Sequence, residues 1–165
     1  RPWWQGCCWG TVPIGGRMSY AGIRDGLVKT IQDGGKWAAS QISTCDFGIV
    51  ELSASAVVLA PGAGTTIRPL EFQSTASVRT KEVSWDITGY VFVKDPGNSL
   101  AMLDRLWTAC DDILSSVNRD DSLNGAASEA HIRSISRPDP DTFYRLNETD
   151  YGVIRFAVTA IEWVD

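Results

Sequence analysis

Residues 83–98 read VSWDITGYVFVKDPGN, and the hydrophobic pattern changes along this stretch. Its first half alternates, with Val83, Trp85 and Ile87 on one side and polar residues between them. Such alternation is typical of a strand with one buried and one polar face. The run YVFV at 90–93 is then continuously apolar. Both faces of this second half must therefore pack against other apolar groups, either from the same chain or from a neighbouring molecule.

The sequence that follows supplies one cover. The turn DPGN at 95–98 ends the strand, and Asn98 or Ser99 is a good helix N-cap. Apolar residues then recur at spacings of three and four, which predicts an amphipathic helix with charged residues on its other side. These residues are Leu100, Leu103, Leu106, Trp107, Cys110, Ile113, Leu114 and Val117. A short connection folds this helix back over the strand, so the cover is at least partly internal.

One more helix and several short strands account for most of the remaining chain. Ser19 caps a helix that extends to about Asp33 and stops at Gly34-Gly35. Strands are predicted at 47–52, 56–60, 65–72, 77–83, 131–136, 143–146 and 151–164, with turns at 61–64 and 137–141. The predicted fold is α+β, a mainly antiparallel sheet with two helices packed on one face and a projecting β-arm.

The projecting arm is predicted at residues 65–83. Pro69 cannot donate a hydrogen bond to a sheet, so its strand is an edge strand or one side of a projecting hairpin. Arms of this kind reach a neighbouring subunit or add strands to its sheet, although an ordinary loop-rich sheet edge is the other interpretation. The candidate interface residues in this segment are Arg68, Pro69, Phe72, Arg79 and Lys81.

Residues 1–17, RPWWQGCCWGTVPIGGR, differ from the single domain predicted at 18–165. They form an irregular Trp- and Cys-rich arm. If the arm is native, its tryptophans need burial against a neighbouring molecule, and Trp3 and Trp4 join the candidate interface residues. The alternative is that Met18 is the natural start and the earlier residues come from upstream sequence. The redox state and partners of Cys7 and Cys8 stay open, with unpaired thiols the simpler interpretation.

Composition excludes several classes of protein. The chain has 165 residues, 44% of them apolar, and a net charge of -5 with 15 scattered Lys and Arg residues. These values indicate an ordinary globular domain and disfavour tight binding to nucleic acid. The sequence predicts neither a membrane span nor a signal peptide, and hence a protein that is made and used without secretion.

Residues with catalytic chemistry are few. His131 is the single histidine, and Glu129 lies two positions before it, so an acid–base pair or two ligands on one strand face is conceivable there. An exposed or structural histidine is the simpler interpretation. The paired Asp111 and Asp112 are explained by a solvated helix face, and Asp139 and Asp141 by turn chemistry. No catalytic, cofactor-binding or metal-binding residue is predicted, and the protein is not expected to be an enzyme.

The order of elements resembles a known family. A first helix is followed by strands with a protruding arm, then WDITGYVFV leads through DPGN into the helix LAMLDRLWTACDDIL. A short segment around a leucine, DSLNG at 121–125, and a closing strand YGVIRFAVTAIEWV complete the pattern. From about Ser19 to Val164 the chain resembles the tail terminator (tail completion, or neck) proteins of long-tailed bacteriophages. The arm before Met18 has no counterpart in that pattern.

The resemblance implies a structural role in the virion. Such proteins form a hexameric ring at the head–tail junction, cap the tail tube, contact the head connector or stopper protein, and surround the DNA channel. The ring would assemble in the bacterial cytoplasm, and the 65–83 arm would contact other subunits or the tail tube. A tail-tube or head-completion protein is the nearest alternative. A small-ligand-binding or enzymatic α+β domain, with a pocket around His131, is the alternative from a different class.

Overall fold

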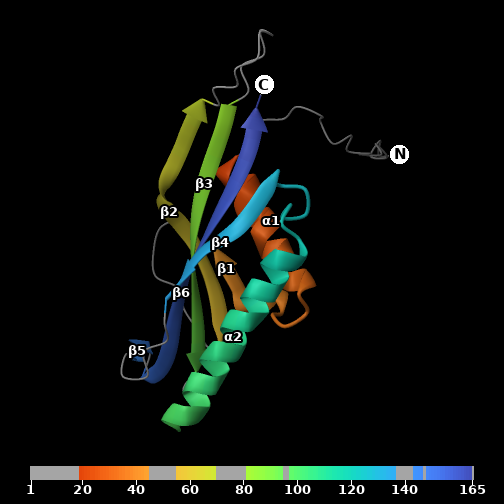
Figure 1. Cartoon of the computed structure of the whole chain (residues 1–165). Helices are drawn as coiled ribbons and strands as arrows, with labels where there is room; N and C mark the ends of the chain where they lie inside the picture. Colours follow the sequence, from red (N-terminus) through yellow and green to blue (C-terminus); the bar gives the residue numbers. More distant parts are fainter. Residues whose placement is uncertain are drawn as a thin grey trace, which may run out of the picture.

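The molecule is organised around a mixed sheet of six strands in the order β1-β2-β3-β6-β4, with β5 paired to the other end of β6 (Figure 1). The computed structural model describes residues 19–44, 55–69, 81–94, 97–136, 143–146 and 148–164. The strands are β1 (Ile42–Thr44), β2 (Ala56–Pro69), β3 (Lys81–Lys94), β4 (Glu129–Ile135), β5 (Phe143–Leu146) and β6 (Thr149–Val164). Among the strands of these described residues, only the β1–β2 pairing is parallel. The α+β prediction is confirmed.

The centre of the sheet is the antiparallel pair β3–β6. All 14 residues of β3 are in register with β6, from Lys81 opposite Val164 to Lys94 opposite Tyr151. β2 pairs with the other edge of β3 along most of its length. The opening stretch of sequence therefore lies in the middle of the sheet, where each face must be accounted for.

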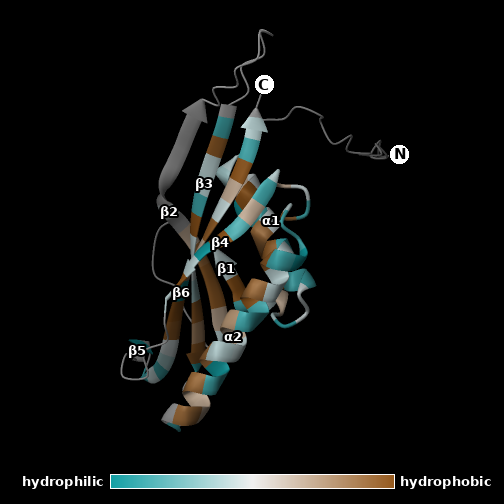
Figure 2. Cartoon of the chain, viewed as in Figure 1, coloured by the Kyte–Doolittle hydropathy of each residue, from teal (hydrophilic) through white to brown (hydrophobic). Residues whose placement is uncertain are grey.

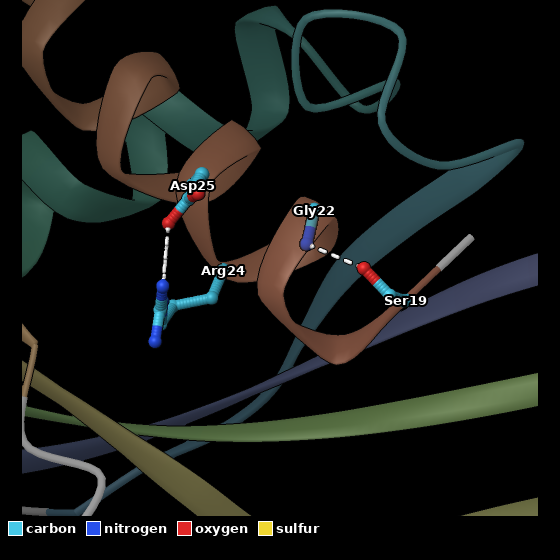
Figure 3. Close-up of polar contacts among 4 residues, drawn as sticks. All are labelled: Ser19, Gly22, Arg24 and Asp25. Carbon is cyan, nitrogen blue, oxygen red and sulfur yellow. Dashed lines mark hydrogen bonds and ion pairs between the residues drawn. The ribbon is translucent and has the colours of Figure 1, made fainter.

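Two helices cover one face of the sheet. They are α1 (Tyr20–Asp33) and α2 (Ser99–Arg119), and each begins at the predicted cap. The Ser19 hydroxyl accepts a hydrogen bond from the Gly22 N–H at 3.1 Å (Figure 3). The Asn98 side-chain carbonyl accepts from the N–H groups of Leu100 and Ala101. These bonds satisfy N–H groups that the first turn of a helix leaves without intrahelical partners.

The main core lies between these helices and the inner face of the sheet. In β3 and β6 the inward residues alternate as the sequence predicted, and Ile87, Val91, Ile154, Phe156 and Val158 are at most 1% exposed. They pack against buried side chains of both helices. Each buried side chain of this size contributes about 1.5–3 kcal/mol relative to leaving it exposed. The helices therefore supply the internal cover that the sequence predicted.

The outer face of the same strands carries a second, smaller apolar cluster. Ala56, Val58 and Tyr151 are buried there, and the half-buried Tyr90 and Phe92 pack against them. The ring of Phe92 meets that of Tyr151 edge-on, at a centroid distance of 6.4 Å. In Figure 2 the lower half of β3 is almost entirely hydrophobic, whereas its upper half mixes polar and apolar residues. The continuous apolar run thus divides between two cores.

The structure corrects the predicted turn at 61–64. Strand β2 continues from Ala56 to Pro69, and its pairing with β3 shifts register between Pro61 and Thr65. A bulge of this kind accommodates a proline and two glycines without ending the strand. The short strand β1 and the 3-10 turn η1 (Ala39–Gln41) were not predicted. The predicted strand at 47–52 and turn at 137–141 lie outside the described residues.

The predicted apolar face of α2 is also corrected at its edges. Leu100 is 68% exposed and Trp107 is 46% exposed, whereas Met102 and Ala109 are buried. Cys110 is buried as expected, and burial raises the pKa of its thiol to about 11. The buried side of the helix is therefore shifted from the predicted one toward Met102 and Ala109, which leaves the large side chain of Trp107 partly in solvent.

Glycine 89 offers a test of how tightly β3 and β6 pack. Its register partner is Phe156, and a Cβ at position 89 would overlap the Phe156 ring. We expect Gly89→Ala to lower the free energy of unfolding by about 1–3 kcal/mol, because the ring must shift inside a packed core. Urea unfolding measures this value.

The matched control is Gly22→Ala in the first turn of α1. The nearest atom to its added Cβ is the Ser19 hydroxyl oxygen at 3.5 Å, an ordinary contact. This variant should be unchanged or more stable, by up to about 1 kcal/mol, because alanine loses less backbone entropy in a helix than glycine does. Equal effects of the two substitutions would contradict the packing described at Gly89.

Candidate subunit interface

The predicted arm is continuous with the central sheet. Residues 65–69 of β2 pair with residues 81–85 of β3, which also pairs there with the last residues of β6. The upper ends of these three strands extend beyond α1 (Figure 1). Among the described residues, β2 has no strand partner on its far edge after Leu59, so Pro69 lies in an edge strand as predicted.

The candidate interface residues divide into two groups. Arg68, Pro69 and Lys81 belong to the paired ends of β2 and β3, which brings their backbones together at one end of the sheet. Phe72, Arg79, Trp3 and Trp4 lie outside the described residues. The structure therefore joins three of the seven predicted positions and leaves their contacts as a prediction.

A tryptophan that the sequence did not single out lies at this same end. Trp163 is 53% exposed and is the register partner of Glu82 near the end of β6. The alternation of the last strand placed Ile154 to Ala160 correctly. The same alternation places Trp163 on the outer face of β6 with Arg155 and Ala157, where the helices supply no core. Tryptophan is enriched at the centres of protein interfaces, so Trp163 is added to the candidate contact residues at this end of the sheet.

The solvent side of α2 forms a second exposed surface. Trp107 lies one turn from Asp104 and one turn from Asp111, and all three are exposed. Leu100 lies two turns before Trp107 on the same side. We call Leu100, Asp104, Trp107 and Asp111 the α2 ridge. Because i, i+3, i+4 and i+7 positions share a helix face, the ridge points away from the sheet.

The outer face of the sheet carries a polar hollow. It is lined by Asp86, Ile87, Thr88, Arg133, Ser134, Arg155 and Ala157, and we call it the arginine hollow. The Asp86 carboxylate accepts a hydrogen bond of 2.8 Å from the Thr159 hydroxyl and lies 4.0 Å from the Arg133 guanidinium. A register shift in β4 between Ile132 and Ser134 brings Arg133 over this face.

The segment DSLNG forms the tight turn between α2 and β4. Leu123 is fully buried although its φ is 50°, and Asn124 follows with a φ of 58°. These left-handed conformations are strained for residues other than glycine and persist only where surrounding contacts hold them. The close approach of α1 supplies such contacts, because a Cβ at Gly26 would lie 2.5 Å from the Leu123 carbonyl oxygen.

The Asp120 carboxylate fixes this turn to α1. It accepts hydrogen bonds from the Ser122 hydroxyl at 2.7 Å, the Asn124 N–H at 2.7 Å and the buried Thr30 hydroxyl at 3.1 Å. The bond from Ser122, followed by those from Asn124 and Thr30, lowers the pKa of Asp120 below its ordinary value of 3.8. The network joins residues about 90 positions apart in sequence, so it has a structural role.

The described residues give no support to a catalytic or metal site around His131. His131 and Glu129 are both exposed on β4. Within the described ranges, no group of three or more His, Cys, Asp and Glu side chains is arranged to hold a metal ion. The arginine hollow does not include His131 among its lining residues. The features with the clearest chemistry are therefore the exposed surfaces.

Comparison with protein-family models finds no match to this chain, and comparison with curated proteins finds no relative. None of the helices in the described part of the chain is long and apolar enough to span a membrane.

Replacement of Asp120 by Asn tests the turn network. A carboxylate with a lowered pKa stabilises the fold above pH 3.8 and loses that contribution as the pH falls through its folded pKa. We expect Asp120→Asn to destabilise the protein at pH 7 by about 1–2 kcal/mol, since the amide cannot accept all three bonds. The difference from wild type should shrink when urea unfolding is repeated at pH 2–3 (roughly one unit below ordinary aspartate values).

The adjacent Asp121→Asn is the control, because Asp121 is exposed. It should change stability by less than about 0.5 kcal/mol. A difference between wild type and Asp120→Asn that stays constant with pH would contradict the role of the Asp120 charge.

Proposed function

We propose that the chain is a ring-forming structural subunit of the tail-terminator type. In this role copies of the chain form a hexameric ring at the head–tail junction of a long-tailed bacteriophage. The ring caps the tail tube, joins it to the head connector or stopper protein and surrounds the DNA channel. The role is not catalytic and needs no cofactor. It implies assembly in the bacterial cytoplasm and a final location in the virion neck.

The observation that carries this proposal is the long β2–β3 hairpin joined to β6. Its described residues extend the sheet past the helix layer, with an edge strand on one side and the exposed Trp163 at the end. Extended edges of this kind pair with a neighbouring chain unless they are protected. The order of helices and strands also agrees with the pattern on which the resemblance rests.

The distribution of exposed groups supports a ring over a two-fold dimer. The α2 ridge and the arginine hollow lie on opposite layers of the molecule and differ in charge. Contacts between unlike surfaces are heterologous, and they generate closed rings when the rotation between neighbours closes. The net charge of -5 suits a ring through which DNA passes without specific binding, because an acidic surface does not hold phosphates.

Negative-stain electron microscopy of the purified protein, with the mass measured on the same sample, tests the proposal. We expect single closed rings with a central pore and a mass of six copies. Added to growing tail tubes, the protein should stop elongation at one end, because the ring caps the tube.

Long stacked tubes would instead indicate a tail-tube protein. A protein that forms no ring, either alone or on tube ends, would contradict the proposed role. His131→Ala serves as a control, since an exposed histidine outside the arginine hollow should not affect assembly.

A further inference from the structure

We propose that the α2 ridge of one copy binds the arginine hollow of the next copy. This inference rests on the proposed ring and names one of its contacts. The partner is a second copy of this chain, and the contact is charge-complementary. Its two halves lie on opposite faces of the two-layer fold, since the ridge points away from the sheet and the hollow opens on the face that the helices leave uncovered.

The hollow has a net positive charge in an acidic protein. Two arginines and one carboxylate line it, and the carboxylate of Asp86 already accepts from Thr159 and lies within ion-pair range of Arg133. The Arg155 side chain is exposed, and its backbone is fixed by two hydrogen bonds with Ser136. Two exposed guanidinium groups on a fixed backbone favour carboxylate partners, which they can bind with paired N–H donors.

The ridge presents the complementary groups. Asp104 and Asp111 lie on either side of Trp107, with no other charged residue between them on that helix face. Trp107 is 46% exposed. Tryptophan is enriched among the residues that contribute most of the binding energy at protein interfaces, so Trp107 is a suitable centre for this contact. An aromatic side chain flanked by two carboxylates fits a hollow whose lining includes Thr88, Ala157 and two arginines.

The spacing of the charges also agrees. Asp104 and Asp111 are separated by ~10 Å along the helix axis, at 1.5 Å per residue. The β4–β6 register places Arg133 beside Ala157 and Val158, two to three residues from Arg155 along β6, which separates the two arginine positions by ~7–10 Å along the strands. Both carboxylates can therefore meet a guanidinium while Trp107 lies over the hollow.

Nucleic acid is the less suitable occupant. Two arginines that share the hollow with the Asp86 carboxylate offer little neutralisation to a phosphate backbone, and the whole chain has a charge of -5. A single pair of carboxylates needs only the two cations that the hollow provides.

Charge exchange between the two surfaces tests the contact. Self-association of the full chain is measured by sedimentation velocity over a concentration series at low salt. We expect Asp104→Arg/Asp111→Arg, and separately Arg133→Glu/Arg155→Glu, to raise the Kd by about tenfold or more, since like charges then face each other. An equimolar mixture of the two variants should recover association, because each reversed surface meets a reversed partner. Added salt should weaken the wild-type contact.

Controls separate this contact from general charge effects. Arg105→Glu and Asp121→Arg change exposed residues outside the ridge and the hollow, so they should leave the Kd within about twofold of wild type. Circular dichroism of each variant confirms that it is folded. A milder variant, Arg155→Gln, should weaken association less than the full reversal, and it remains informative if a reversed variant fails to fold.

Several results would overturn the inference. These are a wild-type chain that stays monomeric at the highest attainable concentration, variants that associate like wild type, and a mixture without recovery. Binding of duplex DNA that Arg155→Glu abolishes, with self-association unchanged, would assign the hollow to nucleic acid instead. If wild type and both charge-reversed variants all form rings, this contact is refuted and the proposed ring is left intact. Association through the ridge and the hollow that forms no closed ring would support this contact and refute the proposed ring.

Discussion

The uninterrupted register between β3 and β6 is the constraint on which the rest of the structure depends. Fourteen residues of β3 pair with β6 without a bulge, which fixes the inward and outward direction of every side chain in the middle of the sheet. The inward set forms the floor on which α1 and α2 pack. The outward set places Asp86, Thr88 and Arg155 together on the uncovered face. A slip of one residue would exchange the two sets, so the core and the polar hollow depend on the same pairing.

Much of this arrangement follows from local patterns in the sequence. Both helix starts, the strand at 151–164 and the inward face of β6 were predicted, because caps and alternation depend on neighbouring residues. The bulge at 61–64 was missed since proline and glycine indicate a turn unless a long partner strand holds them extended. The exposure of Trp107 was missed because periodicity gives a helix its apolar side but not the width of its contact with the sheet.

The candidate interface was harder to predict than the fold. The sequence indicated the segment that contains Arg68 and Lys81. In the structure these residues lie on the paired strands β2 and β3. Nothing in the sequence indicated the arginine hollow, because Arg133 and Arg155 are distant in sequence. They meet only through the β4–β6 pairing and the register shift beside Arg133. The Asp120 network has the same character, since it joins α1 to a turn about 90 residues away. Surfaces assembled from distant segments require the fold before they can be recognised.

In the proposed assembly, two unlike faces of the chain join copies head to tail into a ring. A cryo-electron microscopy reconstruction of the assembled protein is the decisive experiment. The predicted result is a closed ring with cyclic symmetry only, in which the helix layer of each copy faces the uncovered sheet face of the next. A particle with two-fold axes relating neighbouring copies, or with every helix layer exposed to solvent, would contradict it.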